Sequence, residues 1–117
     1  MYLGTKNVGR IQPTTIGTIR AETWDVECGD SEFVTRGRSP RERTRINVHH
    51  WDGALDGYSR LQTDGRWVIY SSYTRKDLGI AIRRSATRWD VLRGRRKVGH
   101  TIGPDGPPAA TALLTVC

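Results

Sequence analysis

The strongest local indication of the fold is the segment Asp64-Gly65-Arg66-Trp67-Val68-Ile69-Tyr70. Asp-Gly readily adopts the positive φ angles of a two-residue hairpin turn, and a run of large residues follows it as a strand. Because four consecutive residues of that run are large, we expect the strand to be central in its sheet.

Segments on both sides of this strand show the same two-residue period. Apolar and polar residues alternate there, as in strands with one buried and one exposed face. Residues 22–35 are expected to form a hairpin, and Arg93-Gly94 is expected to turn the chain back onto a neighbouring strand. The alternating apolar positions are Trp24, Val26 and Cys28; Ile46 and Val48; Leu78, Ile80 and Ile82; Trp89 and Val91; and Val98, His100 and Ile102.

Helical patterns are weak by comparison. Thirteen glycines are spread along the chain, and each would cost about 1 kcal/mol inside a helix. We allow one short helix at Ala54–Gln62 or one at Ala109–Val116. The expected fold is therefore all-β with at most one or two short helices, as a small antiparallel barrel or sandwich.

The chain of 117 residues is long enough for a single domain. We expect a β-rich domain over residues 1–102 and a Gly/Pro linker over 103–108, where prolines cannot donate to a ladder. Residues 109–117 form an apolar C-terminal tail. The tail is expected either to pack back as an edge strand or to dock on another copy of the chain.

The two cysteines, Cys28 and Cys117, are too few for the usual disulfide framework of a small secreted domain. Cys28 occupies an inward-facing strand position, where it is expected to act as a small buried apolar residue. Cys117 is assigned no role. No ligand spacing typical of zinc is present, so we expect no metal and no cofactor.

The net charge of +7 is unevenly distributed. Residues 21–34 contain five acidic residues and no basic ones. Residues 35–50 contain five arginines against one glutamate, and residues 83–97 contain six arginines and one lysine against one aspartate. The protein is therefore polarised, with an acidic hairpin and two basic segments.

Sixteen of the 19 basic residues are arginine. The planar guanidinium pairs with two phosphate oxygens at once and stacks on bases, which favours a nucleic-acid partner, either DNA or RNA. A GC-rich genome also favours arginine codons, and this explanation stays open. Trp51 and Tyr73 lie beside polar turns and are the candidate stacking platforms. The candidate contact residues are Arg36, Arg38, Arg41, Arg43, Arg45, Arg83, Arg84, Arg88, Arg93, Arg95, Arg96, Lys97, Trp51 and Tyr73.

One short segment suggests catalysis, namely Val48-His49-His50-Trp51-Asp52-Gly53. It resembles the start of the motif in HNH-type homing nucleases. The resemblance implies His50 as general base, with His49 and Asp52 as further candidates. It covers about six residues, and the following segment 54–67 lacks the asparagine and histidine that the family places later. Two adjacent histidines on a strand face opposite sides, so both could reach one metal only across a bulge.

The expected function is non-enzymatic nucleic-acid binding, with arginines on phosphates. The first alternative is a structural or interaction protein, such as a small phage virion component that self-assembles through hairpin 21–34 and tail 109–117, or an inhibitor of a host protein. The second alternative is a metal-dependent HNH-like nuclease. No apolar run reaches the roughly 18 residues of a membrane helix, so we expect no membrane partner. The expected location is the cytoplasm or a virion.

Overall fold

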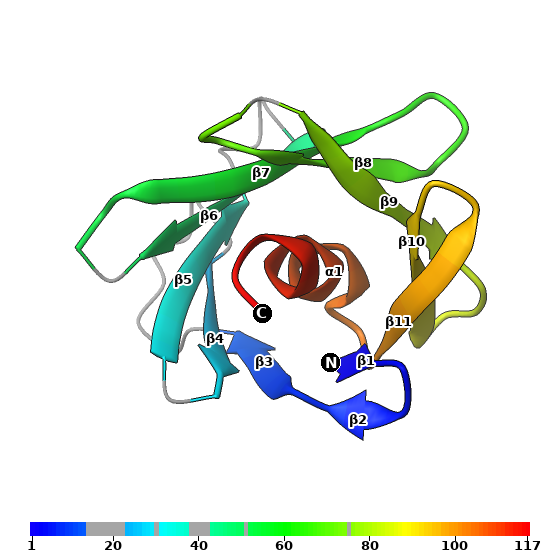
Figure 1. The fold of residues 1–117 in the computed structure, drawn as a ribbon, viewed down its shortest axis with the longest axis horizontal. Coiled ribbons are helices and arrows are strands. Elements are labelled where there is room, and N and C mark those ends of the chain that lie inside the picture. The colour runs from blue at the N-terminus through cyan, green and yellow to red at the C-terminus, as the bar shows by residue number, and fades with distance from the viewer. Residues whose placement is uncertain (14–22, 30, 38–42, 51, 75) are drawn as a thin grey trace.

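The strands form one antiparallel sheet that curls around a C-terminal helix in this computed structural model (Figure 1). The structure describes residues 1–13, 23–29, 31–37, 43–50, 52–74 and 76–117, with the backbone alone for 31–37. The elements are β1 (Tyr2–Leu3), β2 (Lys6–Asn7), β3 (Gly9–Pro13), β4 (Thr23–Cys28), β5 (Ser31–Gly37), β6 (Arg45–His50), β7 (Leu55–Leu61), β8 (Trp67–Ser71), β9 (Asp77–Arg83), β10 (Arg88–Arg93), β11 (Arg96–Ile102) and α1 (Gly106–Thr115).

The sheet order is β2-β1-β11-β10-β9-β8-β7-β6-β5-β4-β3. Its two edge strands, β2 and β3, are consecutive in the chain with Val8 between them. Among the described residues no ladder joins these edges, so the sheet surrounds α1 without closing into a barrel. The prediction of a single all-β domain is confirmed, and β8 is the central strand, as its run of large residues indicated.

The helix α1 fills the interior of the curled sheet. Pro107 and Pro108 lie in the first turn of the helix. Backbone N–H groups there have no acceptor within the helix, so proline, which has no N–H, costs little at these positions. The alanines and leucines that follow favour a helix. Residues Ala109 to Leu114 are all buried against the inward side chains of the strands, such as Val26, Val48 and Ile69. The tail is therefore the centre of the core, and burial of its apolar surface stabilises the fold at about 25 cal/mol per Å².

Glycines on three strands make room for this helix. A Cβ atom at Gly79 would lie 2.7 Å from Leu114 Cδ1, and one at Gly99 would lie 3.1 Å from Leu113 Cδ2. A Cβ at Gly57 would clash with Thr115. The same glycines that argued against helices are therefore what allows a helix to pack closely on the strands.

Covalent and polar contacts tie α1 to the sheet. A disulfide joins Cys28 on β4 to Cys117 just after the helix, with 5.6 Å between their Cα atoms. At the other end, Trp24 Nε1 donates a hydrogen bond of 3.0 Å to Asp105 Oδ1, at the residue before the helix. Both ends of α1 are thereby held by β4.

Several expectations for local structure are corrected. The helix at Ala109–Val116 is confirmed, but Ala54–Gln62 is not helical, because Leu55–Leu61 pairs with β6 and β8 as β7. The tail is neither an edge strand nor a free docking segment, since its apolar side chains are in the core. Residues 106–108 of the expected linker belong to α1.

The predictions for the cysteines and the turns also have clear outcomes. Cys28 is buried as predicted, but Cys117 has a role after all, in the disulfide. The turn at Asp64-Gly65 is longer than two residues, because Gln62 N donates to Arg66 O across it, with Gly65 at φ +88°. The hairpins of β4 with β5 and of β10 with β11 follow the sequence prediction.

Candidate nucleic-acid interface

The antiparallel strands carry arginines from several hairpins to one end of the sheet. β7 and β9 end there, while β6, β8 and β10 begin there. The register shows the convergence, because Arg45 lies opposite Arg60, and Arg83 lies opposite the neighbour of Arg88. We call this the basic end and define it by the described residues Arg43, Arg45, Arg60, Arg66, Arg83, Arg84 and Arg88.

The basic end joins part of the first sequence cluster to part of the second. The backbone of Arg36 lies on β5 opposite Asn47, close to the same end. Arg38 and Arg41 lie outside the described residues. Arg60 and Arg66 are not among the contact residues expected from the sequence. Arg60 lies in one of the two segments that we allowed as a short helix, and Arg66 follows the Asp64-Gly65 turn. The pairing of residues before and after Asp64-Gly65 was the signal that could have found both.

Few carboxylates neutralise the basic end within the described part of the chain. Asp64 Oδ2 pairs with Arg66 Nε at 2.6 Å, in an exposed position where such a pair contributes little. Arg83 Nε donates to the carbonyl of Ser85 at 3.2 Å. Arg43 and Arg60 are exposed, and no described carboxylate pairs with either. Several guanidinium groups there are therefore available to an anion.

Asp90 is the exception, because three basic side chains converge on it. Its carboxylate receives Arg84 at 2.9 Å, and Arg88 and Lys97 at 3.3 Å each, and the residue is only 8% exposed. Burial acts to raise the pKa of Asp90, but the hydrogen bonds from the three bases outweigh it and hold the pKa below its ordinary value. Lys97 is drawn toward Arg84 and Arg88 by this carboxylate.

An aromatic stack adjoins the basic end on the outer face of β6, β7 and β8. Tyr58 and Tyr70 are direct partners in the β7–β8 ladder, and their ring centroids are 5.1 Å apart with an interplanar angle of 22°. The Arg45 guanidinium carbon lies 4.2 Å from the Tyr58 centroid, and that of Arg60 lies 5.8 Å away. Arg45 Nε also donates to Asn47 Oδ1 at 2.9 Å.

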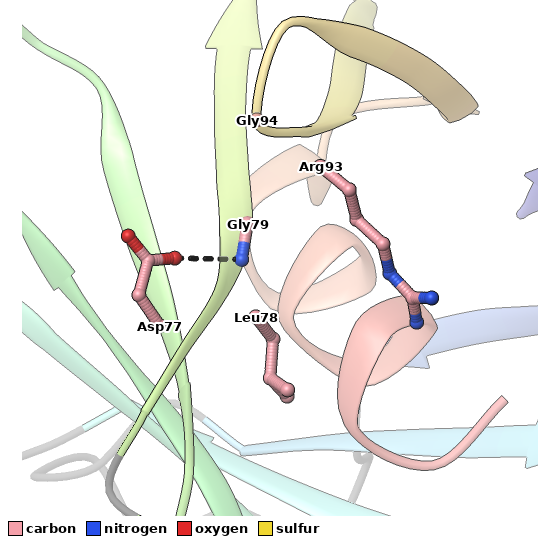
Figure 2. Close-up of a pocket in the computed structure, with 5 residues that line it drawn as sticks. All are labelled: Asp77, Leu78, Gly79, Arg93 and Gly94. Carbon is pink, nitrogen blue, oxygen red and sulfur yellow. Dashed lines mark hydrogen bonds between the residues drawn. The ribbon is translucent and has the colours of Figure 1, made fainter.

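Other predicted contact residues lie at the opposite end of the sheet. Arg93, Arg95 and Arg96 surround the β10–β11 turn, so the second cluster is divided between the two ends. Arg93 lines an open cavity of about 550 Å³ with Asp77, Leu78, Gly79 and Gly94. Figure 2 shows these five residues. Asp77 Oδ1 accepts a hydrogen bond of 2.8 Å from Gly79 N. This cavity is not continuous with the basic end.

The histidine segment forms a different cluster at that opposite end. His50 Nδ1 pairs with Asp56 Oδ2, and Tyr73 Oη donates to Asp56 Oδ1 at 3.2 Å. This hydrogen bond raises the pKa of Tyr73, whose side chain is otherwise exposed. Asp56 is 5% exposed and lies in β7 next to a bulge.

This cluster does not bring the two histidines to one metal. His49 Nδ1 contacts the carbonyl of Gly53 at 3.1 Å, and Asp52 Oδ1 accepts from Ala54 N at 3.0 Å. Among the described residues no group of three or more His, Cys, Asp or Glu side chains could hold a metal ion. Trp51, between these residues, lies outside the described part of the chain. Asp56 instead links the β6–β7 and β8–β9 turns.

No family model, curated protein or solved structure matches this chain. Within the described residues, no helix is both long enough and apolar enough to cross a membrane. A functional assignment must therefore come from the chemistry of the basic end and the stack beside it.

Proposed function

We propose that the protein binds nucleic acid without enzymatic activity, through phosphate contacts at the basic end. The observation that carries this proposal is the convergence of arginines from three hairpins on one end, where Asp64 and Asp90 are the described carboxylates that pair with them. Guanidinium groups suit this role because each presents a planar fork of donors that matches phosphate oxygens.

The wide spacing of these arginines favours a polyanion over a small anion as the partner. The arginines of the basic end are spread across β6 to β10 and do not converge on one point, except at Asp90. A single phosphate contacts only a few such groups, whereas a nucleic-acid backbone offers a charge at each nucleotide. Affinity should then fall with salt, with a slope of about 0.9 per phosphate on duplex DNA and about 0.7 on single strands.

Two matched double variants test where the phosphates bind. Arg60→Ala with Arg83→Ala removes two charges from the basic end, and Arg95→Ala with Arg96→Ala removes two from the opposite end. Fluorescence anisotropy with a labelled oligonucleotide should show roughly tenfold or more weakening for the first variant and a smaller loss for the second. Equal losses would mean that the net charge acts without a defined site. Absence of binding by the wild-type protein at about 50 mM salt would refute the proposal.

The disulfide bears on the location in which this binding takes place. Disulfides such as Cys28–Cys117 persist in oxidising surroundings and are rare in the reducing cytoplasm. Of the two expected locations, we therefore propose the virion. Mass spectrometry of thiol-alkylated protein, isolated without reductant, should show neither cysteine labelled. Labelling of both cysteines in the native host would favour the cytoplasm.

A further inference from the structure

The outer face of β6, β7 and β8 carries a stack that the phosphate contacts alone do not require. β7 lies between β6 and β8, so Arg45 and Tyr70 approach the ring of Tyr58 from opposite sides. The result is an ordered series of one guanidinium and two aromatic rings across three strands. Planar groups held in this way are the kind of surface on which nucleobases stack.

Two positively charged side chains, Arg45 and Arg60, lie next to each other beside this stack. Arg45 and Arg60 lie directly opposite each other in the β6–β7 ladder, an arrangement that destabilises a sheet. Attraction to the face of Tyr58 offsets part of this repulsion. Arg60 is exposed, and no described carboxylate pairs with it. A phosphate beside Arg60 would be attracted to its exposed guanidinium group.

The neighbouring surface is apolar. Arg60 lies opposite Val68 on β8, and the same row across the sheet continues with Ile80 on β9 and Leu92 on β10. These side chains are half-buried, and they alternate with the core residues Ile69, Ala81 and Val91. They therefore line the outer face, where they offer an apolar strip to the faces of bases. In a duplex those faces are stacked on one another and cannot reach such a strip.

We propose that this face, defined by Arg45, Tyr58, Arg60 and Tyr70, binds single-stranded nucleic acid by stacking with its bases. The inference rests on the proposed nucleic-acid binding and adds the class of substrate. Arg45 and Arg60 hold phosphates beside the stack, Tyr70 continues the stack with a base, and the strip beyond Arg60 contacts the next bases. The basic end guides the strand onto this face.

The test compares three probes that carry the same backbone charge per nucleotide. They are a labelled single strand, its duplex, and a single strand of equal length built from abasic nucleotides. The wild-type protein should bind the single strand about tenfold or more tighter than the abasic strand, because stacked bases add to the phosphate contacts that both strands make. Binding to the duplex should be weaker than to the single strand once the number of nucleotides is matched.

Tyrosine variants then locate the stacking site. Tyr70→Leu should lose about fivefold or more in affinity for the single strand and change affinity for the abasic strand little. Tyr70→Phe keeps the ring and should retain wild-type affinity. Tyr2→Leu is the matched control, because Tyr2 stacks on His100 elsewhere on the sheet, with 4.6 Å between ring centroids. Circular dichroism and thermal unfolding of each variant establish that it is folded.

The outcomes separate the two proposals. If no probe binds, the proposed function itself is wrong. If all three probes bind equally, or if Tyr70→Leu folds and keeps full affinity for the single strand, nucleic-acid binding stands and the stacking face is wrong. If Tyr2→Leu loses as much as Tyr70→Leu, the face has been placed on the wrong strands.

Discussion

Ser59 on β7 and Thr111 on α1 share a hydrogen bond of 2.7 Å in the interior, although 52 positions separate them in the chain. Thr111 Oγ1 donates its own hydrogen to the carbonyl of Pro107 at 2.8 Å, so the Ser59 hydroxyl must donate to Thr111. Both residues are fully buried. This contact adds a directional restraint on the position of the helix to those that the disulfide and the Trp24–Asp105 hydrogen bond supply at its two ends.

Thr111→Val should therefore destabilise the protein by about 1 to 3 kcal/mol, since the buried Ser59 hydroxyl would lose its acceptor. The double variant Ser59→Ala with Thr111→Val removes both polar groups and should recover much of that loss. Urea denaturation of both single variants and the double variant gives the coupling free energy. Additive losses would show that the two hydroxyls are not coupled.

The disulfide should contribute to stability chiefly by restricting the unfolded chain. Cys28 and Cys117 are separated by 89 positions, and the chain-entropy relation gives roughly 4 to 5 kcal/mol for closing a loop of that length. Reduction should lower the free energy of unfolding by about that amount, as measured by urea denaturation with and without reductant. The Cys28→Ala, Cys117→Ala double variant should be equally destabilised and insensitive to reductant. A wild-type protein that reductant leaves unchanged would contradict this.

His100 should make stability depend on pH below neutrality. Its pKa is lowered from 6.5 by burial first and then by the charges of Arg88 and Lys97, against the opposite effect of Asp90. A base with a lowered pKa binds its proton more weakly in the folded than in the unfolded state. The free energy of unfolding should therefore fall as the pH drops below about 6.5.

The variant His100→Phe isolates this contribution, because it keeps a ring to stack on Tyr2 and removes the titrating group. Denaturation at pH 7 and at pH 5.5 should show a smaller loss of stability in the variant than in the wild-type protein. Equal losses in the two proteins would assign the pH dependence to other groups.

The sequence predicted the strands well and the centre of the fold poorly. Alternation identifies a strand locally, as at Trp24, Val26 and Cys28, because the pattern needs no distant partner. The place of residues 109–117 depends on what they pack against, and an apolar run of nine residues fits an edge strand, a helix or an interface equally. Gly57, Gly79 and Gly99 appeared as helix breakers, yet their function is to accept the helix.

The candidate site was predictable in composition but not in arrangement. The two arginine clusters were visible, but which residues share an end depends on strand direction, and this divides residues 83–97 between both ends. Tyr58 and Arg60 lie in segment 54–62, which we allowed as a short helix, so their alignment with residues of neighbouring strands was not expected. The role of Asp90 could not be read from spacing, because Lys97 reaches it across the β10–β11 ladder.

Asp90 also restrains the charges that the proposed function needs. Its carboxylate engages Arg84, Arg88 and Lys97 at once, so a phosphate must compete with it for the same donors. Asp90→Asn keeps the shape of the side chain and removes its charge. We expect the variant to bind a single-stranded oligonucleotide severalfold more tightly at pH 7. Its affinity should also depend more steeply on salt, because more basic side chains contact phosphate.

The same substitution should reduce stability, because three partly exposed cations lose the buried carboxylate that pairs with all of them. The lowered pKa of Asp90 sets the range in which this loss appears. A carboxyl whose pKa is lowered in the folded state stabilises the protein at pH values above its ordinary pKa of 3.8. That contribution disappears as the pH falls further, through the lowered pKa. Wild-type and Asp90→Asn proteins should therefore differ in free energy of unfolding at pH 7 and converge in acid. A variant that is less stable and binds no more tightly would show that Asp90 supports the fold without restraining binding.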